Sequence, residues 1–417
     1  MRKLAFASLL LVACGGSNQA SAPPHLDIPV PPAKTSGAQG TSKGHEAPPA
    51  SLASKPSPFP AVGRAKLDSG LRVAVVSAPA LPIVQIRIVT FAGMGYGTPG
   101  AAQLTAEMLK EGGTRTMTSA TLLSKIEALG ASLSVDTDFD RSVLSLGVTK
   151  DHLDEALSLL GQVVMEPRFD SGEFRKLKAR RTDEAREAAR GSGAWSATRV
   201  MFRELYTEQN PYSHYDLVPS EIAKVNEQTL GDFHKKFYVP SNMEIIVTGD
   251  VNLSTAQNAV QKSMGTWKGA APPKVEFPEA IAPAKRRVII ASRPHSEQSD
   301  IFVASLGPAR NAQDWPDLRV ANQVLGGGVA SRLFADVREQ RSLAYSTRSQ
   351  ILELGHGKEP VFAYAGTATK KTGLAVMGIL ENLEKISQST IEQSETASAG
   401  RYLSDIFAIR LESIGSI

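Results

Sequence analysis

The sequence predicts an α+β protein of two homologous halves, each a mainly antiparallel sheet covered by helices. Runs rich in β-formers share one layered domain with helical patterns, and the same order of elements restarts near residue 287. The chain has 417 residues, 42% of them hydrophobic, which is enough for two or three domains. Because residues 61–268 form the first copy and only 287–417 remain for the second, we expect the second half to be truncated.

The amino terminus has the pattern of a signal peptide, with a basic start and an apolar run over residues 1–13. Residues 11–14 (LVAC) resemble a bacterial lipobox, which implies cleavage before Cys14 and lipidation of its thiol. An ordinary secretory signal with an incidental cysteine is the alternative. Gly15, rather than Asp, follows the cysteine, so we expect a lipid anchor in the cell envelope, at the outer membrane and facing the periplasm.

Residues 14–60 are rich in Pro, Ser, Ala and Gly and are predicted to form a disordered tether. His25 and His45 lie in it, where nothing would preorganise a metal site. With a single cysteine in the chain, an intrachain disulfide and a thiolate zinc cluster are both excluded. The formal net charge of +4 is scattered rather than gathered into a stripe, which disfavours nucleic-acid binding.

The first half is predicted to combine strands and helices in one layered domain. A polar turn around Asp138 and Asp140 divides two expected strands within residues 131–148. The other expected strands are 71–78, 82–93 and 243–251, and the expected helices are 100–112, 118–129, 150–163, 171–190, 195–207 and one ending at 233–238.

A Pro- and Ala-rich stretch, residues 269–286, is predicted to be an interdomain linker. The second copy then follows, and its final stretch spaces Leu403, Ile406, Phe407 and Leu411 as for burial on a helix. The expected strands are 286–293, 300–307, 343–354 and 361–369, with helices over 317–326 and 330–341.

Several segments together resemble the pitrilysin/insulinase family of zinc metallopeptidases, in particular bacterial members similar to mitochondrial processing peptidase. The resemblance runs from Leu67 onward and rests on LDSGLRVAVV, LPIVQIRIVTFAG, PGAAQLTAEMLKEGG, IEALGASLSVDTDFD, NPYSHYDLVPSEIAKV, FYVPSNMEIIVTGDV and VLGGGVASRLFADVREQRSLAYS. It implies the two-half fold described above and an ancestry in peptide hydrolysis.

The family carries His-x-x-Glu-His on a helix, where two imidazoles bind zinc and the glutamate polarises water. Aligned on the flanking residues, these positions are Gln103, Ala106 and Glu107, so both imidazoles and the general base are missing. The third ligand falls on Glu184 and a supporting glutamate on Leu177. The two carboxylates would suit Ca²⁺ or Mg²⁺ better than zinc, and we expect no resident metal or other cofactor.

The other histidines show no paired spacing of a metal site, and each is expected to be exposed or hydrogen-bonded: His152, His214, His234, His295 and His356.

Arg338 and Tyr345 match the arginine and tyrosine that active family members bring from the second half to the zinc cleft. There they hold the substrate backbone and stabilise the oxyanion. Spacing alone also allows an arginine that caps a helix and a tyrosine in a strand core. The glycines 326–328 lack a following Lys-Ser/Thr signature, so they indicate a mobile turn rather than a nucleotide loop.

A chain without the zinc motif that keeps these two residues resembles the non-catalytic partner of two-chain family members. The resemblance implies a pseudopeptidase that forms a heterodimer with a zinc-bearing sister chain, acts on peptides and is inactive alone. The alternatives are a non-enzymatic scaffold or peptide-binding lipoprotein with this fold, and an active single-chain protease, which would cleave peptides alone in a chelator-sensitive way.

Overall fold

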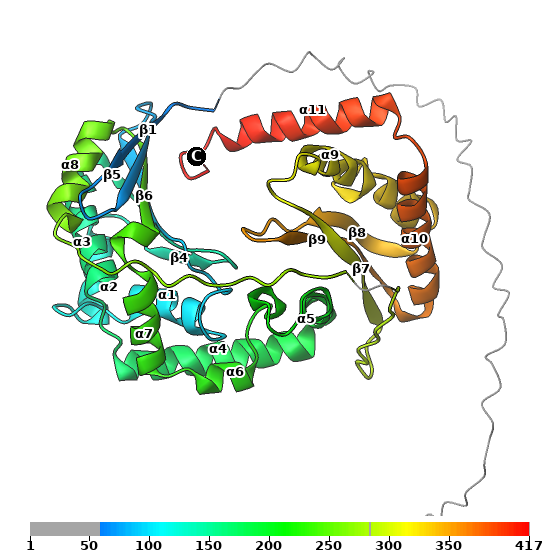
Figure 1. Ribbon diagram of the computed structural model, residues 1–417, viewed down its shortest axis with the longest axis horizontal. Coiled ribbons are helices and arrows are strands. Elements are labelled where there is room, and N and C mark those ends of the chain that lie inside the picture. Colours follow the sequence, from blue (N-terminus) through cyan, green and yellow to red (C-terminus); the bar gives the residue numbers. More distant parts are fainter. Residues whose placement is uncertain (1–58, 283–284, 417) are drawn as a thin grey trace, which may run out of the picture. The chain divides into compact units, whose positions relative to one another are not determined.

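The first half is built around a mixed sheet of six strands (Figure 1). The computed structural model describes residues 59–282 and 285–416, so the predicted signal, Cys14 and almost all of the tether lie outside the described residues. The strand order is β1-β2-β6-β3-β5-β4, and only the β2–β6 pair is parallel. The strands are β1 (Val62–Lys66), β2 (Arg72–Ser77), β3 (Ile83–Thr90), β4 (Ser134–Thr137), β5 (Ser142–Thr149) and β6 (Met243–Gly249).

Helices cover this sheet and extend from it. The main core combines alternate residues of the central strands, such as Ile86, Leu146 and Ile245, with apolar faces of helices. The helices of this half are α1 (Ala101–Glu111), α2 (Ser119–Ala128), α3 (Leu153–Met165), α4 (Ser171–Gly191), α5 (Gly193–Leu205), α6 (Pro219–Lys224), α7 (Glu227–Phe237) and α8 (Leu253–Met264).

The second half has a smaller antiparallel sheet of three strands in the order β7-β9-β8. The fold class predicted from the sequence, sheets covered by helices, is therefore confirmed. The elements are β7 (Gln298–Ala309), α9 (Trp315–Gly326), β8 (Ala344–Ile351), β9 (Lys358–Ala368), α10 (Thr372–Gln388) and α11 (Gln393–Arg410), with a π-helical segment over Phe334–Gln340.

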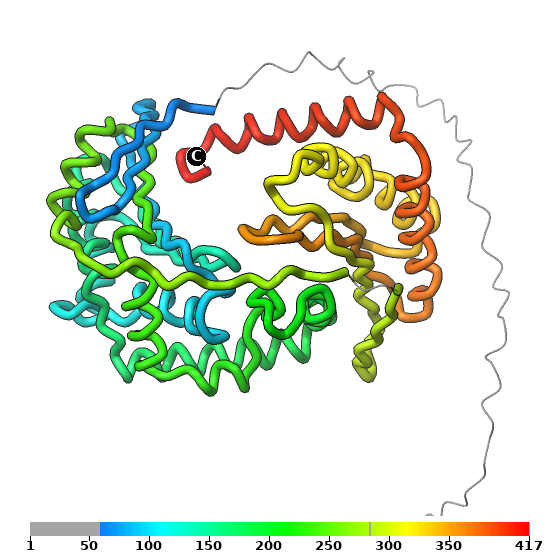
Figure 2. The backbone as a smooth tube through the Cα atoms, viewed as in Figure 1, coloured from blue at the N-terminus to red at the C-terminus, as the bar shows by residue number. Residues whose placement is uncertain are grey.

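The chain between α8 and β7 forms no helix or strand in its described residues (Figure 2). Residues 286–293 were expected to be a strand, and this expectation is wrong: Val288 is 88% and Ile290 85% exposed. Their β-branched sequence favours a strand, but an isolated strand has no ladder or apolar face to stabilise it.

The expected burial along the last helix is also wrong. Helix α11 contacts α9, yet Phe407 remains 45% exposed and Leu403, Ile406 and Leu411 are only partly buried. The periodic spacing is present, but too little of the described chain packs against it. None of the described helices is both long and apolar enough to cross a membrane.

Polar contacts join the two halves at the turn between β4 and β5. Asp140 Oδ2 accepts from the backbone N–H of Gly355 at 2.7 Å, and its Oδ1 accepts from the Tyr212 hydroxyl. The N–H of His356 donates to the Tyr212 oxygen at 3.1 Å, while the His356 ring stacks on Phe277 with centroids 4.1 Å apart. This turn therefore anchors the loop between β8 and β9.

Candidate functional site

A glycine sets the start and direction of α1. Gly100 has a φ of 88° and precedes the first turn of the helix. A Cβ at this position would lie 3.2 Å from Val225 Cγ2 and 3.4 Å from Leu217 Cδ2. Because positive φ and close packing both favour glycine, the Pro99-Gly100 turn determines which way the α1 side chains point.

The motif face of α1 is buried. Ala106 is fully buried, and Gln103 is only 7% exposed. Gln103 Oε1 accepts no hydrogen bond from the described residues. Next to this face, Leu104 shares an apolar cluster with Leu177 of α4. Leu177, at the position where the resemblance places a supporting glutamate, is therefore part of the apolar core.

Two arginines of α4 lie against the carboxylates of this site. Arg181 Nε is 3.4 Å from Glu107 Oε1, and Arg181 Nη1 donates to Glu184 Oε2 at 2.8 Å. The neighbouring Arg180 pairs with Glu111 at 2.8 Å and lies 3.8 Å from Glu107 Oε2. The structure thus brings Glu107 and Glu184 together, with a guanidinium bridging them.

Charge and burial act in opposite directions on this pair. Burial raises the pKa of Glu107, whereas the positive charge of Arg181 lowers it, and the net direction is upward. Burial lowers the pKa of Arg181, but the negative charges of Glu107 and Glu184 outweigh this and raise it. Arg181 is therefore a permanent cation beside Glu107 and Glu184.

Zinc does not fit these residues. Protein zinc sites use imidazole, thiolate or carboxylate donors in tetrahedral sets, whereas this face offers an amide, a methyl group and one carboxylate. The guanidinium of Arg181 beside Glu107 would also repel any divalent cation, Ca²⁺ and Mg²⁺ included. Among the described residues, no three His, Cys, Asp or Glu side chains form a group that could hold a metal.

Arg338 and Tyr345 lie in the second half, and the contacts of their side chains do not reach the α1 site. Arg338 belongs to the π-helical segment, stacks over the Phe334 ring at 4.5 Å and has its Nε 3.5 Å from Glu339 Oε1. Tyr345 is 63% exposed on β8, at a break in the register with β9. Within the described part of the chain, neither side chain is hydrogen-bonded or ion-paired to α1 or α4.

The sequence did not lead us to predict that Arg180 and Arg181 lie against the carboxylates of this site. The pairing of Arg181 with Glu184 follows a three-residue helical spacing and could have been found in the sequence. The approach of Arg181 to Glu107 could not, since it depends on how α1 and α4 pack.

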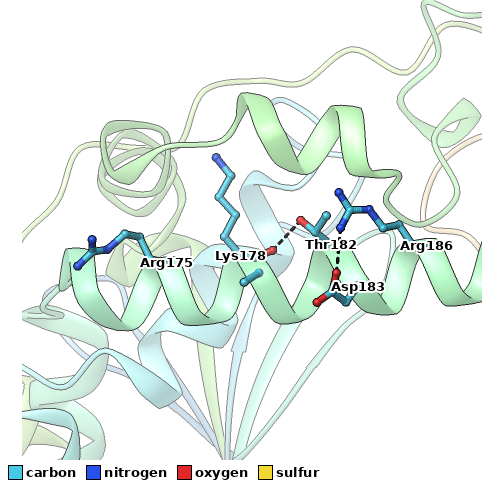
Figure 3. A pocket seen from close by; sticks show the side chains of 6 residues that line it. Arg175, Lys178, Thr182, Asp183 and Arg186 are labelled. Atoms are coloured by element: carbon cyan, nitrogen blue, oxygen red, sulfur yellow. Dashed lines mark hydrogen bonds and ion pairs between the residues drawn. The ribbon is translucent and has the colours of Figure 1, made fainter. Parts of the chain in front are cut away.

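A shallow hollow of about 380 Å³ lies on another face of α4 (Figure 3). Its cationic side chains are engaged: Lys178 Nζ donates to the backbone carbonyls of Ala223 and Val225 at 2.9 and 2.7 Å, and Arg186 pairs with Asp183 at 2.9 Å. This hollow is separate from the Glu107–Arg181 cluster, and its paired charges offer no anion site.

Two family models match most of the folded chain. Residues 72–203 match the model of insulinase, peptidase family M16, and residues 224–402 match the peptidase M16 inactive domain. The chain belongs to peptidase family M16. The family resemblance predicted from the sequence is confirmed.

Curated M16 relatives include both zinc proteases and inactive proteins by name. An uncharacterized zinc protease YmxG of Bacillus subtilis is 22% identical over 85% of this chain and 86% of its own length. A protein of Helicobacter pylori named non-peptidase homolog YmxG is 24% identical over 76% of this chain and 72% of its own. The probable inactive metalloprotease YmfF of B. subtilis is 22% identical over 59% of this chain and 58% of its own. The M16 relatives of this chain therefore include members without peptidase activity by name.

Solved structures share the fold. A peptidase M16 inactive domain from Pseudomonas fluorescens superposes with a TM-score of 0.75 and 25% identity over 84% of this chain and 86% of that one. A protease from H. pylori superposes with a TM-score of 0.77 and 19% identity over 86% and 87%.

Proposed function

We propose that this chain is a zinc-lacking pseudopeptidase that completes the cleft of a zinc-bearing M16 partner. The observation that carries the proposal is the Arg181 guanidinium lying between Glu107 and Glu184, where active members place zinc donors. A fixed cation there is incompatible with metal-activated water, so any peptide hydrolysis requires zinc held by another chain.

The contribution of this chain to catalysis is Arg338 and Tyr345. Both side chains reach solvent, with Arg338 43% and Tyr345 63% exposed. Neither is committed to a buried hydrogen bond within the described residues, so both are available to a second chain. A cation and a phenol hydroxyl aimed at a developing oxyanion lower the barrier electrostatically.

The proposal extends to the location of the complex. Zinc is carried by the partner, the substrate is a peptide, and the lipidated Cys14 holds the heterodimer at the outer membrane on the periplasmic side. Cleavage and lipidation at Cys14 can be followed by mass spectrometry of the mature protein.

The test is coexpression with an M16 chain of the same cell that carries His-x-x-Glu-His, followed by peptide-cleavage assays of the purified pair. We expect Arg338→Ala to reduce kcat/KM by about 10²-fold, the scale for losing one oxyanion contact, with Tyr345→Phe smaller. Arg401→Ala, on exposed α11, is the matched control. Full activity of the Arg338→Ala complex would eliminate the catalytic role.

The second candidate function is a non-enzymatic scaffold or peptide-binding lipoprotein. It is favoured by the H. pylori relative, whose name denies it peptidase activity. A protein that stays monomeric beside the zinc-bearing chain and binds peptides without hydrolysis would support this candidate. Chelator-sensitive cleavage by the isolated chain would contradict both candidates.

A further inference from the structure

The guanidinium of Arg348 lies over an aromatic ring and has no ionic partner in the described chain. Arg348 is exposed on β8, and its Cζ atom lies 4.1 Å from the centroid of the Tyr364 ring on β9. The two residues are directly opposite in the β8–β9 ladder. Among the described residues, no hydrogen bond or ion pair reaches the Arg348 side chain. Its N–H donors are therefore free for a ligand, while the ring beneath restricts where the charge can lie.

Tyr364 is itself held in place. Its side chain is buried, and its hydroxyl donates to Asp300 Oδ1 on β7 at 2.7 Å. Asp300 also accepts from the Gln298 amide at 3.2 Å. The Tyr364 ring belongs to the apolar cluster that includes Phe362, so packing and a hydrogen bond both fix it. A ring fixed in this way orients the guanidinium above it before any ligand arrives.

The two glutamates that follow β8 in the chain have partners elsewhere. Glu353 Oε2 pairs with Arg310 Nε at 3.2 Å. Glu359 Oε2 accepts from the Trp315 indole N–H at 2.7 Å. The positive charge of Arg348 is therefore left for a carboxylate from outside the described chain.

Arg348 lies on the same side of the sheet as Tyr345. Gly366 of β9 allows this, because a Cβ there would lie 3.0 Å from the Tyr364 hydroxyl oxygen and 3.2 Å from Tyr345 Cε1. The absence of a side chain at Gly366 lets the Tyr345 ring lie beside Tyr364, over which Arg348 is held. The two β8 residues are roughly 10 Å apart along the strand. An extended peptide advances by the same length per residue, so Arg348 can reach a side chain within about three residues of a bond that Tyr345 contacts.

We propose that Arg348 is a specificity residue that binds an acidic side chain of the peptide substrate. A guanidinium presents two parallel N–H donors that match the two oxygens of a carboxylate. The inference rests on the proposed function for the peptide substrate and for the contact of Tyr345 with the bond that is cleaved. The substrate class that follows is peptides with a glutamate or aspartate within about three residues of that bond.

The first test measures binding by the 417-residue protein alone, so it needs no zinc-bearing chain. The probe is an acetylated and amidated fluorescent peptide with a single glutamate among alanine, valine and leucine residues, and its match carries glutamine instead. We expect anisotropy to show about fivefold tighter binding of the glutamate peptide, the upper range for an exposed ion pair. This preference should fall as the salt concentration rises, because screening weakens a contact between charges.

Substitutions at Arg348 separate charge from shape. Arg348→Gln should remove the preference for glutamate, and Arg348→Lys should keep part of it, since lysine keeps the charge without the planar pair of donors. Arg348→Glu should reverse the preference in favour of a peptide with lysine. Arg401→Gln, on exposed α11, is the control and should bind as the native protein does. Absent or equal binding of the two peptides by the native protein, or an unchanged preference in Arg348→Gln, would refute the site.

A third peptide, with glutamine and a free C-terminal carboxylate, distinguishes the source of the charge. If the native protein binds this peptide more tightly than the glutamate peptide, Arg348 binds chain ends and the proposed occupant is wrong.

Cleavage assays of the heterodimer separate this inference from the proposed function. Loss of the glutamate preference in kcat/KM with Arg348→Gln supports the inference. If Arg338→Ala lowers kcat/KM while the native complex cleaves both peptides equally, the proposed function holds and this inference fails. If the complex cleaves neither peptide while the isolated chain prefers glutamate, the proposed function fails and Arg348 remains a carboxylate site.

Discussion

At the scale of single residues, a cation lies between the two carboxylates that α1 and α4 contribute to the candidate site. Arg181 reaches Glu107 and Glu184 from α4 with its Nε and Nη1 atoms. Two carboxylates this close to one another would repel without a cation between them. In this chain the guanidinium of Arg181 supplies that cation.

The raised pKa of Glu107 predicts a pH-dependent contribution to stability. Folding favours the protonated carboxyl, so the contribution of Glu107 is fully present below the ordinary glutamate pKa of about 4.3 and is lost as pH rises through the folded pKa. We expect the free energy of unfolding of the native protein, relative to Glu107→Gln, to be larger at pH 4 than at pH 7.

Denaturant titrations across this range measure the difference, on a scale of about 1.4 kcal/mol per tenfold change in proton affinity. Glu127→Gln, on an exposed position of α2, is the control. If the stability difference between the native protein and Glu107→Gln grows with pH instead, the attraction of Arg181 outweighs the effect of burial on the pKa of Glu107.

At the scale of elements, the β4–β5 turn links the halves through polar groups. Asp140 accepts from Tyr212 of the first half and from Gly355 of the second, and Tyr96 donates to or accepts from His356 at 3.1 Å. Burial, together with the negative charge of Asp140, raises the pKa of Tyr96 to about 12, which keeps its hydroxyl protonated at neutral pH. The carboxylate of Asp140 is therefore one of the groups that hold the loop between β8 and β9, alongside Glu359, whose Oε1 accepts from the Leu354 N–H.

We expect Asp140→Ala to destabilise the protein by about 1–3 kcal/mol, because it leaves the Gly355 N–H and the Tyr212 hydroxyl without their acceptor. Thermal unfolding measures the loss, and hydrogen exchange should quicken at residues 354–357. Asp68→Ala, in an exposed turn, should change neither. Tyr212→Phe should destabilise the Asp140→Ala variant less than it destabilises the native protein, since the two side chains share one hydrogen bond. Additive losses of stability would contradict this shared network.

Elements with a clear local period could be predicted from the sequence, and those that depend on a partner could not. The α4 pattern predicts residues 171–190, and the helix spans Ser171–Gly191. Residues 286–293 carry as strong a strand pattern as β2, yet only β2 has neighbours in the ladder. The short edge strand β1 gave too brief a pattern to detect. In the candidate site, the absence of zinc donors can be predicted from the motif. The Arg181–Glu107 contact cannot, because it arises from packing between helices.

At the scale of the whole molecule, the halves have unequal cores. The first half buries a large cluster across its sheet of six strands, with Ile86, Leu146 and Ile245 among its fully buried residues. The second has three strands and a smaller cluster around Leu333 and Ile379. Because stability grows with the apolar surface that a unit buries, the described part of the second half is the less stable of the two.

Native-state hydrogen exchange should therefore separate the halves. We expect amides of β9 to open with a lower free energy than those of β3, although both are central strands with ladders. Two core truncations sharpen the comparison: Ile379→Ala should lower the opening free energy of β9 by about 2–5 kcal/mol and leave β3 unchanged, and Leu146→Ala should act on β3. If β3 and β9 open with equal free energies, and if each truncation shifts both, the halves unfold as one unit. The contacts of Asp140 would then couple the two halves fully. The unequal outcome would instead place Arg338 and Tyr345 on the half that opens more easily.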